Sequence, residues 1–231
     1  EHQSVREALM ALEDLSTDAI LFVVDEGNRL LGSLTDGDIR RGIIHGLGSG
    51  DKLMEFIQSN PKYIRQGNYN LEEIIELRKK NFTIFPVVNE ENVIINVVNF
   101  RKQKSYLPID ALIMAGGRGE RLRPLTDTTP KPLLPVGGKP ILEHNIDRLR
   151  DYGIDDLWIS VRYLGEQIET YFKDGSHKSL RISYVTENEP LGTAGALALV
   201  EGLIHDTILI LNSDILTTIN YEELYLFFKH E

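Results

Sequence analysis

The sequence predicts an α/β protein in which a mostly parallel sheet, covered by helices on both faces, follows a pair of smaller modules of mixed helix and strand. Two observations lead to this fold class. The first part of the chain contains an internal repeat, and the second part alternates apolar strands with helical stretches. The length of 231 residues exceeds one typical domain and suits two.

The repeat sets Ile20–Arg41 on Ile84–Ser105 without a gap, so that VVDE falls on VVNE. Each copy has the pattern of a strand, a tight polar turn and a second strand. An amphipathic helix is expected before each copy. The apolar stripe of the first helix is Val5, Ala8, Leu9 and Leu12, and its counterpart is Leu71, Ile74, Ile75 and Arg78. Repetition at this length predicts two similar modules packed around a pseudo-twofold axis.

A basic stretch without apolar periodicity, RKQKSYLP at 101–108, is expected to be a linker. We therefore expect the paired modules at 1–104, with repeats at about 1–50 and 51–104, and a second domain at 105–231. The strands expected in the second domain are Ala111–Ala115, Leu157–Val161, Ile182–Val185 and Thr207–Leu211. The helices expected there are Ile141–Tyr152, Gly165–Phe172, Ala194–Glu201 and Tyr221–Lys229.

The composition narrows the classes of function. A formal charge of −10 argues against a general binder of nucleic acid or membrane surfaces, because both need a broad cationic face. There is no cysteine, which excludes disulfides and thiolate metal sites and fits a cytoplasmic protein. No apolar run approaches the roughly 18 residues that a membrane span needs.

Glycines and arginines gather in MAGGRGERLRPLT, from Met114 to Thr126. Glycines directly after a buried strand let backbone N–H groups converge on a ligand, and arginines can fork onto phosphate oxygens. The pattern therefore suits a polyphosphate, although a surface turn with solvated arginines is the alternative. The dinucleotide fingerprint fits poorly because no third glycine opens a helix, and the P-loop fits poorly because Pro140 follows Gly138-Lys139.

The longer segment MAGGRGERLRPLTDTTPKPLLPVGGKPIL resembles the sugar-1-phosphate nucleotidyltransferase family, and the resemblance covers residues 110–231. Glu120 departs from the commonest threonine of the family pattern. The resemblance implies a Rossmann-like nucleotidyltransferase domain with a mostly parallel sheet. The matching residues are Gly116, Gly117, Gly119, Arg121, Leu122, Pro124, Leu125, Thr126, Pro130, Lys131, Pro132, Lys139 and Pro140.

The resemblance implies that a sugar phosphate oxygen attacks the α-phosphorus of a nucleoside triphosphate and releases pyrophosphate. Arg121 would hold the leaving pyrophosphate, Lys131 would neutralise the α-phosphate region and Asp214 would bind Mg²⁺. The backbone of the loop would bind the nucleotide through Ala115, Gly116, Gly117 and Gly119. The alternatives are that Lys131 is a solvated loop lysine and that Asp214 caps a helix beginning at Ile215.

A second glycine-containing loop, TENEPLGTAGAL, runs from Thr186 to Leu197. The family uses it to select the base, and its spelling is most similar to guanylyltransferases acting on mannose-1-phosphate or heptose-1-phosphate. The resemblance therefore implies GTP as the nucleotide, bound through Glu187, Gly192 and Thr193. The alternative for Glu187 is a surface acid.

In the N-terminal pair, GSLTDGDIRR resembles the signature of CBS (cystathionine β-synthase) domains. The resemblance implies that Thr35 and Asp38 bind an adenine nucleotide, AMP or ATP, and that the pair forms a homodimer. The second copy has Asn96, Asn99 and Lys102 at the equivalent places and has lost the signature. The alternative is that Thr35 and Asp38 only cap a helix.

The family normally continues beyond the length seen here, with a second metal-binding aspartate and a sugar-phosphate lysine. We therefore expect a truncated nucleotidyltransferase domain with poor or absent turnover. Two other functions remain open, namely a non-catalytic sensor of adenine nucleotides and an assembly scaffold.

Overall fold

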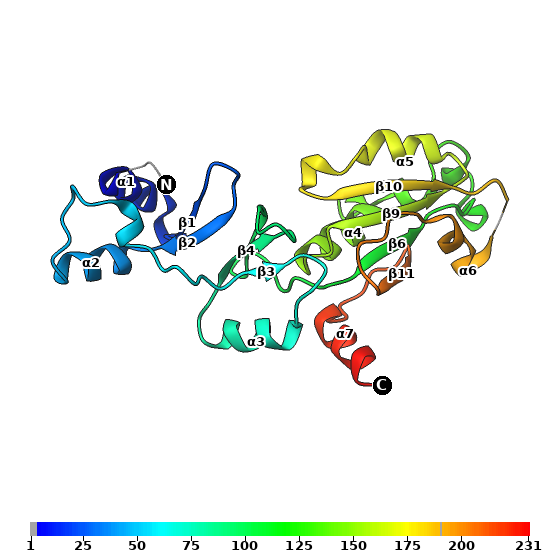
Figure 1. The fold of residues 1–231 in the computed structure, drawn as a ribbon. Coiled ribbons are helices and arrows are strands. Elements are labelled where there is room, and N and C mark those ends of the chain that lie inside the picture. Colours follow the sequence, from blue (N-terminus) through cyan, green and yellow to red (C-terminus); the bar gives the residue numbers. More distant parts are fainter. Residues whose placement is uncertain (1–3, 190) are drawn as a thin grey trace. The chain divides into compact units, whose positions relative to one another are not determined.

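The structure is a computed structural model that describes residues 4–189 and 191–231. It divides the chain into two compact units, Glu1–Arg101 and Lys102–Glu231 (Figure 1). The predicted fold class is confirmed: the chain is a mixed α/β protein with a parallel sheet in its second unit. Within the described residues, no helix combines the length and the apolar character needed to cross a membrane.

The first unit contains the helix and the hairpin expected for each repeat. In each, a helix precedes an antiparallel hairpin, and β3 adds a parallel partner to β4. The first hairpin continues into α2, whereas the second continues into irregular backbone. The elements of this unit are α1 (Val5–Leu15), β1 (Leu21–Val24), β2 (Leu30–Leu34), α2 (Asp36–Ile44), β3 (Ile64–Arg65), α3 (Leu71–Lys79), β4 (Ile84–Val88) and β5 (Ile94–Asn99).

Polar caps set where the helices of this unit begin. Ser4 and Glu7 form a reciprocal capping box at the start of α1, and Asn70 accepts hydrogen bonds from backbone N–H groups at the start of α3. Val5, Ala8 and Leu12 of the predicted apolar stripe then pack on the hairpin that follows α1, whereas Leu9 is 40% exposed. The core of this module consists of Val5, Ala8, Leu12, Val23, Leu34, Ile39, Leu53 and Phe56.

The second unit is built on a four-stranded sheet in the order β10-β9-β6-β11, with every neighbouring pair parallel. All four strands lie within one residue of their predicted positions. The elements are β6 (Asp110–Met114), β7 (Pro135–Val136), β8 (Lys139–Pro140), α4 (Ile141–Asp151), β9 (Asp156–Val161), α5 (Gly165–Phe172), β10 (Arg181–Thr186), α6 (Gly192–Gly195), β11 (Ile208–Asn212) and α7 (Tyr221–His230).

The helix predicted at Ala194–Glu201 is wrong. The chain forms only the four-residue α6, then a 3₁₀ turn at Ala196–Leu199, and Val200 is already extended. Glycine weakens a helix because it loses more backbone freedom on folding than other residues do. Two glycines within α6 therefore keep this segment short, even though its alanines and leucines favour a helix.

The segment predicted as a linker is irregular, and apart from Arg101 it belongs to the second unit. Tyr106 and Leu107 are buried, and the Leu107 N–H donates to the Tyr152 carbonyl over 3.1 Å. Gly153, at φ 68°, allows this packing, because a Cβ there would lie 2.6 Å from the Tyr106 backbone. The stretch thus packs against the end of α4.

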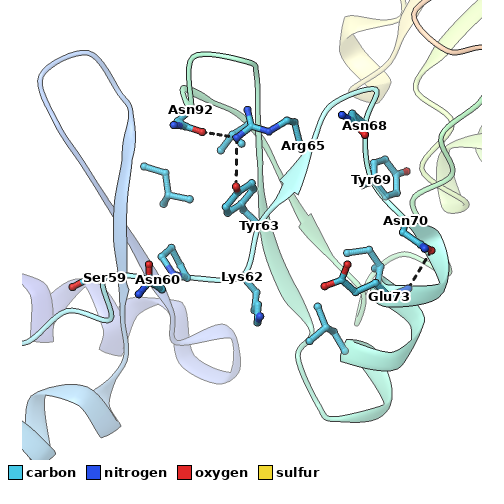
Figure 2. Close-up of a pocket in the computed structure, with 15 residues that line it drawn as sticks. Ser59, Asn60, Lys62, Tyr63, Arg65, Asn68, Tyr69, Asn70, Glu73 and Asn92 are labelled. Atoms are coloured by element: carbon cyan, nitrogen blue, oxygen red, sulfur yellow. Dashed lines mark hydrogen bonds between the residues drawn. The ribbon is translucent and has the colours of Figure 1, made fainter.

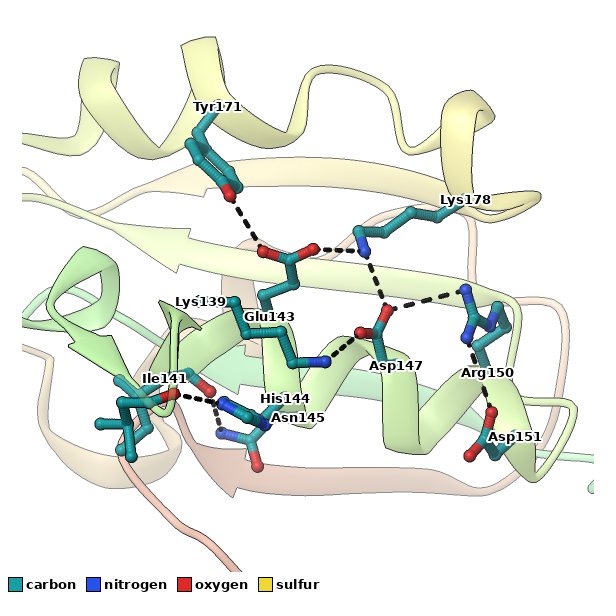
Figure 3. Close-up of polar contacts among 11 residues, drawn as sticks. Lys139, Ile141, Glu143, His144, Asn145, Asp147, Arg150, Asp151, Tyr171 and Lys178 are labelled. Carbon is teal, nitrogen blue, oxygen red and sulfur yellow. Dashed lines mark hydrogen bonds and ion pairs between the residues drawn. The ribbon is translucent and has the colours of Figure 1, made fainter.

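A network of ion pairs joins the β7–β8 hairpin, α4 and the turn before β10 (Figure 3). Lys178 binds both Glu143 and Asp147, at 2.6 and 2.9 Å, and Lys139 binds Asp147 at 2.5 Å. Burial alone would raise the pKa of Asp147, but the hydrogen bonds from Lys139 and Lys178 outweigh it and hold that pKa below its ordinary value. The lysine of the Gly-Gly-Lys-Pro motif therefore pairs within the fold.

Candidate active site

One cavity of about 460 Å³ lies at the carboxyl ends of the parallel strands. Residues that follow β6, β9, β10 and β11 all reach it, which is where ligands bind in open α/β sheets. The structure therefore brings together segments that are far apart in the sequence. The residues that line the cavity are Met114, Ala115, Gly116, Gly117, Arg118, Gly119, Lys131, Pro132, Arg162, Glu187, Gly192, Asn212, Ser213 and Asp214.

Two glycines of the loop after β6 serve different purposes. Gly119 has a φ of 61°, and a Cβ there would lie 2.9 Å from Thr126 Cγ2 and 3.1 Å from Lys131 Cβ. A side chain at this position would strain the backbone and displace Lys131. A Cβ on Gly117 would meet nothing within 4 Å, so the main chain there faces open space that a ligand can fill.

Lys131 and Asp214 form an ion pair in the cavity wall. Lys131 is therefore a paired lysine with 36% of its side chain exposed, and its role at the α-phosphate stays a prediction. No helix begins at Ile215 in the described chain, so the helix-cap alternative for Asp214 is wrong. The segment that carries Asp214 is held from α4, because Asn145 donates its side-chain amide to the Ser213 carbonyl over 2.9 Å.

Glu187 is buried, with 7% of its surface exposed, so it is not a surface acid. Its carboxylate accepts a hydrogen bond from the Ser160 hydroxyl and another from the Leu191 N–H at 3.3 Å. A carboxylate has about four acceptor positions. Glu187 therefore keeps capacity to accept hydrogen bonds from a ligand in the cavity.

Two of the predicted site residues are not found in the cavity wall. Arg121 lies in the 3₁₀ turn Glu120–Leu122, is exposed and does not line the cavity. The side chain of Thr193 lies outside the described residues. The roles of both in binding a nucleotide stay predictions, as do those of the residues that do line the cavity.

Sequence reasoning missed Arg162. Arg162 is the first residue after β9, just as Glu187 is the first residue after β10. This position after a strand was the only feature of the sequence that could have marked Arg162 as a site residue. Sequence reasoning also missed Ser160 and Asn145, whose contacts join segments far apart in the chain. Arg118, which drew attention only as one of several loop arginines, lines the cavity, and its guanidinium lies 5.7 Å from the centre of the Tyr163 ring.

The oxygen ligands available for a metal are few. The cavity holds the carboxylates of Asp214 and Glu187. No group of three or more His, Cys, Asp or Glu side chains that could hold a metal occurs in the part of the chain that the structure describes. Asp214 suits Mg²⁺, which commonly binds one or two carboxylates and completes its shell with phosphate oxygens and water.

In the first unit, Thr35 and Asp38 form a reciprocal capping box at the start of α2. Asp38 is buried and also accepts from Gln58 at 2.8 Å and from Arg41. Burial would raise the pKa of Asp38, but the hydrogen bonds from Thr35, Gln58 and Arg41 outweigh it and lower that pKa. The carboxylate is thus already occupied by protein donors, as the helix-cap alternative requires.

A separate cavity of about 550 Å³ lies in the first unit, and neither Thr35 nor Asp38 lines it. Its walls carry tyrosines, cations and several amides (Figure 2). Arg65 is already hydrogen-bonded within the protein there, because it donates to the Asn89 carbonyl at 2.6 Å and to the Asn92 side chain at 2.7 Å.

Comparison with known families identifies the class of protein. The nucleotidyl transferase family model matches residues 110–231, more than half of the chain, and the chain belongs to this family. The CBS domain model matches residues 1–45. Both resemblances inferred from the sequence motifs are confirmed.

Individual relatives share part of this chain. It is 44% identical over 110 residues to the mannose-1-phosphate guanylyltransferase of Mycobacterium tuberculosis, covering 47% of this chain and 31% of the relative. It is 45% identical over 115 residues to the N-acetylmuramate alpha-1-phosphate uridylyltransferase of Neisseria meningitidis, covering 48% and 49%. The structure of HddC from Yersinia pseudotuberculosis complexed with GMP-PN is 28% identical over 51% of this chain and 53% of that chain, with a TM-score of 0.44. The chain thus spans a third to a half of the curated relatives' length.

Proposed function

We propose that the second unit binds a nucleoside triphosphate in its cavity and transfers the nucleotidyl group to a sugar 1-phosphate, giving a nucleoside diphosphate sugar and pyrophosphate. One observation carries the proposal. The glycine loop, Lys131, Asp214 and Glu187 all line one cavity at the ends of four parallel strands. Both curated relatives are named as transferases that act on a sugar 1-phosphate.

The reaction needs charge stabilisation and positioning more than a protein nucleophile. A phosphate oxygen of the sugar 1-phosphate forms a bond to the α-phosphorus, and the bond from that phosphorus to the bridging oxygen breaks, so the electron pair leaves with pyrophosphate. Lys131 supplies positive charge at the α-phosphate. The main chain at Gly117 borders the open part of the cavity, where its N–H group would donate to the triphosphate. Arg121, on the adjoining turn, is proposed to reach the leaving pyrophosphate.

Asp214 is proposed to hold Mg²⁺ together with phosphate oxygens of the nucleotide. When bound, the metal would neutralise the charge that develops on the phosphate oxygens. Lys131 forms an ion pair with the Asp214 carboxylate, so this pair would have to break when a metal-bound nucleotide binds. The lysine would then be released toward the phosphates, which is where the proposed reaction needs it.

GTP is the proposed nucleotide. Guanine carries two adjacent donors, N1–H and the N2 amine, and the buried carboxylate of Glu187 retains acceptor capacity for both. The Mycobacterium tuberculosis relative is named as a guanylyltransferase. The Neisseria meningitidis relative is named as a uridylyltransferase, so the base requires a direct test.

A thermal shift assay tests the proposal. GTP with Mg²⁺ should raise the melting temperature of the wild-type chain, and Lys131→Met should lose this stabilisation. The control Lys79→Met, which removes a lysine from an exposed ion pair in the first unit, should keep it. Labelled GTP and a panel of sugar 1-phosphates, with mannose 1-phosphate first, report transfer in the same samples. Absence of any stabilisation by nucleoside triphosphates would refute the proposal.

A second function is proposed for the first unit because the CBS domain model matches residues 1–45 within it. AMP or ATP would bind at Thr35 and Asp38 and regulate transfer, in a homodimer located in the cytoplasm. AMP or ATP should then stabilise the wild type and Lys131→Met equally, and Asp38→Ala should lose the effect. Equal stabilisation of Asp38→Ala would move the site elsewhere, and no stabilisation at all would favour a scaffold.

A further inference from the structure

Arg162 stands out among the residues of the cavity that have no assigned role. It directly follows β9, is partly buried and lines the cavity. Among the residues that the structure describes, its guanidinium forms no hydrogen bond or ion pair. A cation that is partly withdrawn from water and lacks a protein partner is well suited to bind a ligand group.

Arg162 and Glu187 flank the same glycine. A Cβ built on Gly116 would lie 3.2 Å from Arg162 Cβ and 3.3 Å from Glu187 Oε1, so the two side chains leave the cavity wall at neighbouring points. Despite this proximity, no ion pair joins them within the described chain. The donor groups of Arg162 and the acceptor groups of Glu187 therefore lie next to each other, and both remain available to a ligand.

The charged side chains beside the glycine loop differ between its two ends. At Gly119, the loop packs against Lys131, which pairs with Asp214 and suits phosphates. At Gly116, the neighbouring carboxylate of Glu187 would repel a phosphate but can accept from a neutral base. The Gly116 end therefore favours the base of the nucleotide.

An arginine beside a carboxylate matches one kind of base edge. Guanine presents the O6 acceptor next to the N1–H and N2 donors, and uracil presents the O4 acceptor next to the N3–H donor. Adenine and cytosine reverse the order, with an amino donor next to a ring nitrogen acceptor. Arginine only donates and an ionised carboxylate only accepts. The pair therefore complements guanine best, uracil in part, and neither adenine nor cytosine.

We propose that Arg162 is a specificity-determining residue that donates to the carbonyl oxygen of the base while Glu187 accepts from the adjacent N–H groups. The proposal rests on the proposed function, because it concerns the nucleotide bound in the same cavity. It adds a ranking of nucleotides, in which GTP binds most tightly, ITP and UTP follow, and ATP and CTP bind most weakly.

Isothermal titration of the full chain with these five nucleoside triphosphates, in excess Mg²⁺, tests the ranking. Arg162→Met should weaken GTP binding about 10- to 100-fold, as expected for a lost charge-assisted hydrogen bond, and should leave ATP binding nearly unchanged. Arg162→Lys keeps the charge without the planar fork and should restore only part of the preference. Arg150→Met, which removes a partly exposed arginine that does not line the cavity, serves as the matched control and should keep the wild-type ranking.

The outcomes separate the two proposals. A loss of GTP preference over ATP in Arg162→Met supports the inference. An equal loss for all five nucleotides would make Arg162 a phosphate-binding cation, and an unchanged ranking would give it no role, so both results overturn the inference while leaving the proposed function intact. If the wild type binds no nucleotide in a manner that depends on Lys131, the proposed function itself fails. Melting curves of each variant confirm that it is folded.

Discussion

At the scale of single residues, the Lys131–Asp214 ion pair is the most informative contact. The two side chains are 36% and 34% exposed, so their pairing contributes little to stability, and exposed pairs are typically worth about 0–1 kcal/mol. The pair places a cation and a carboxylate side by side in the cavity wall. Under the proposed function, both groups would act when a nucleotide and its metal bind.

The pair predicts that Asp214→Asn changes nucleotide affinity in opposite directions with and without metal. In EDTA, the variant should bind GTP more tightly, by about threefold or more, because Lys131 is free and a negative charge is gone. In Mg²⁺, it should bind more weakly, because the proposed metal ligand is lost. Equilibrium dialysis measures both affinities. A change of the same sign under both conditions contradicts the account, and Asp151→Asn, at an exposed position, is the control.

A second residue-scale prediction concerns Asp155. Burial, and then the neighbouring charge of Asp156, raises the pKa of Asp155 to about 6. Because the unfolded value is near 3.9, the folded chain binds more protons between about pH 4 and pH 6, and this group makes stability fall as the pH rises through that window. Asp155→Asn removes the effect. Its stability relative to the wild type should increase from pH 4 to pH 6 and then level off.

Urea unfolding at pH 4, 5, 6 and 7 measures the difference between Asp155→Asn and the wild type. The difference cancels the contributions of other carboxyl groups, such as Asp147 and Glu143, whose lowered pKa values act in the opposite direction. A difference that does not vary with pH would show that Asp155 titrates normally in the folded chain.

Much of the site could be predicted at this scale, because its residues stand in a recognisable relation to apolar strands. Gly117, Lys131, Asp214 and Glu187 all follow strands or proline-rich motifs that mark them in the sequence. Arg162 could not be predicted in this way. In the sequence, a single arginine after a strand cannot be distinguished from a solvated surface cation, and only the fold places it in the cavity wall.

At the scale of elements, the ion-pair network around Lys178 joins α4 to the turn before β10 (Figure 3). The lysine side chain is 13% exposed, and its two partners are almost as well shielded. Its contribution should therefore exceed that of a surface pair, because removing it leaves two shielded carboxylates without their shared cation.

Lys178→Met should lower the free energy of unfolding by about 2 kcal/mol. Lys79→Met removes a lysine that pairs with Glu76 on the surface and should cost less than about 0.5 kcal/mol. Denaturant unfolding of both variants gives the comparison. Equal effects would mean that burial of the network adds nothing to its strength.

The sequence predicted the elements well where periodicity was strong. The four strands of the sheet and helices α4, α5 and α7 all formed close to their expected positions. The prediction failed at Ala194–Glu201, where alanines and leucines favour a helix. The nearby glycines oppose it, and the chain forms only a short 3₁₀ turn at Ala196–Leu199.

At the scale of the whole molecule, the chain consists of two units, each with a core of its own. Every residue that lines the proposed nucleotide cavity comes from Lys102–Glu231. The repeat in the sequence predicted a helix and a hairpin for each copy in the first unit, and both copies have them. The ligand of that unit could not be predicted, because Thr35 and Asp38 also satisfy each other as a helix cap.

A crystal structure of the chain with Mg²⁺ and a non-hydrolysable GTP analogue tests the central claim most directly. The account predicts that the triphosphate lies over the glycine loop within hydrogen-bond distance of Lys131 Nζ and that the guanine lies beside Glu187. A nucleotide bound in the cavity of the first unit, with the ends of β6 and β11 left vacant, would contradict the account.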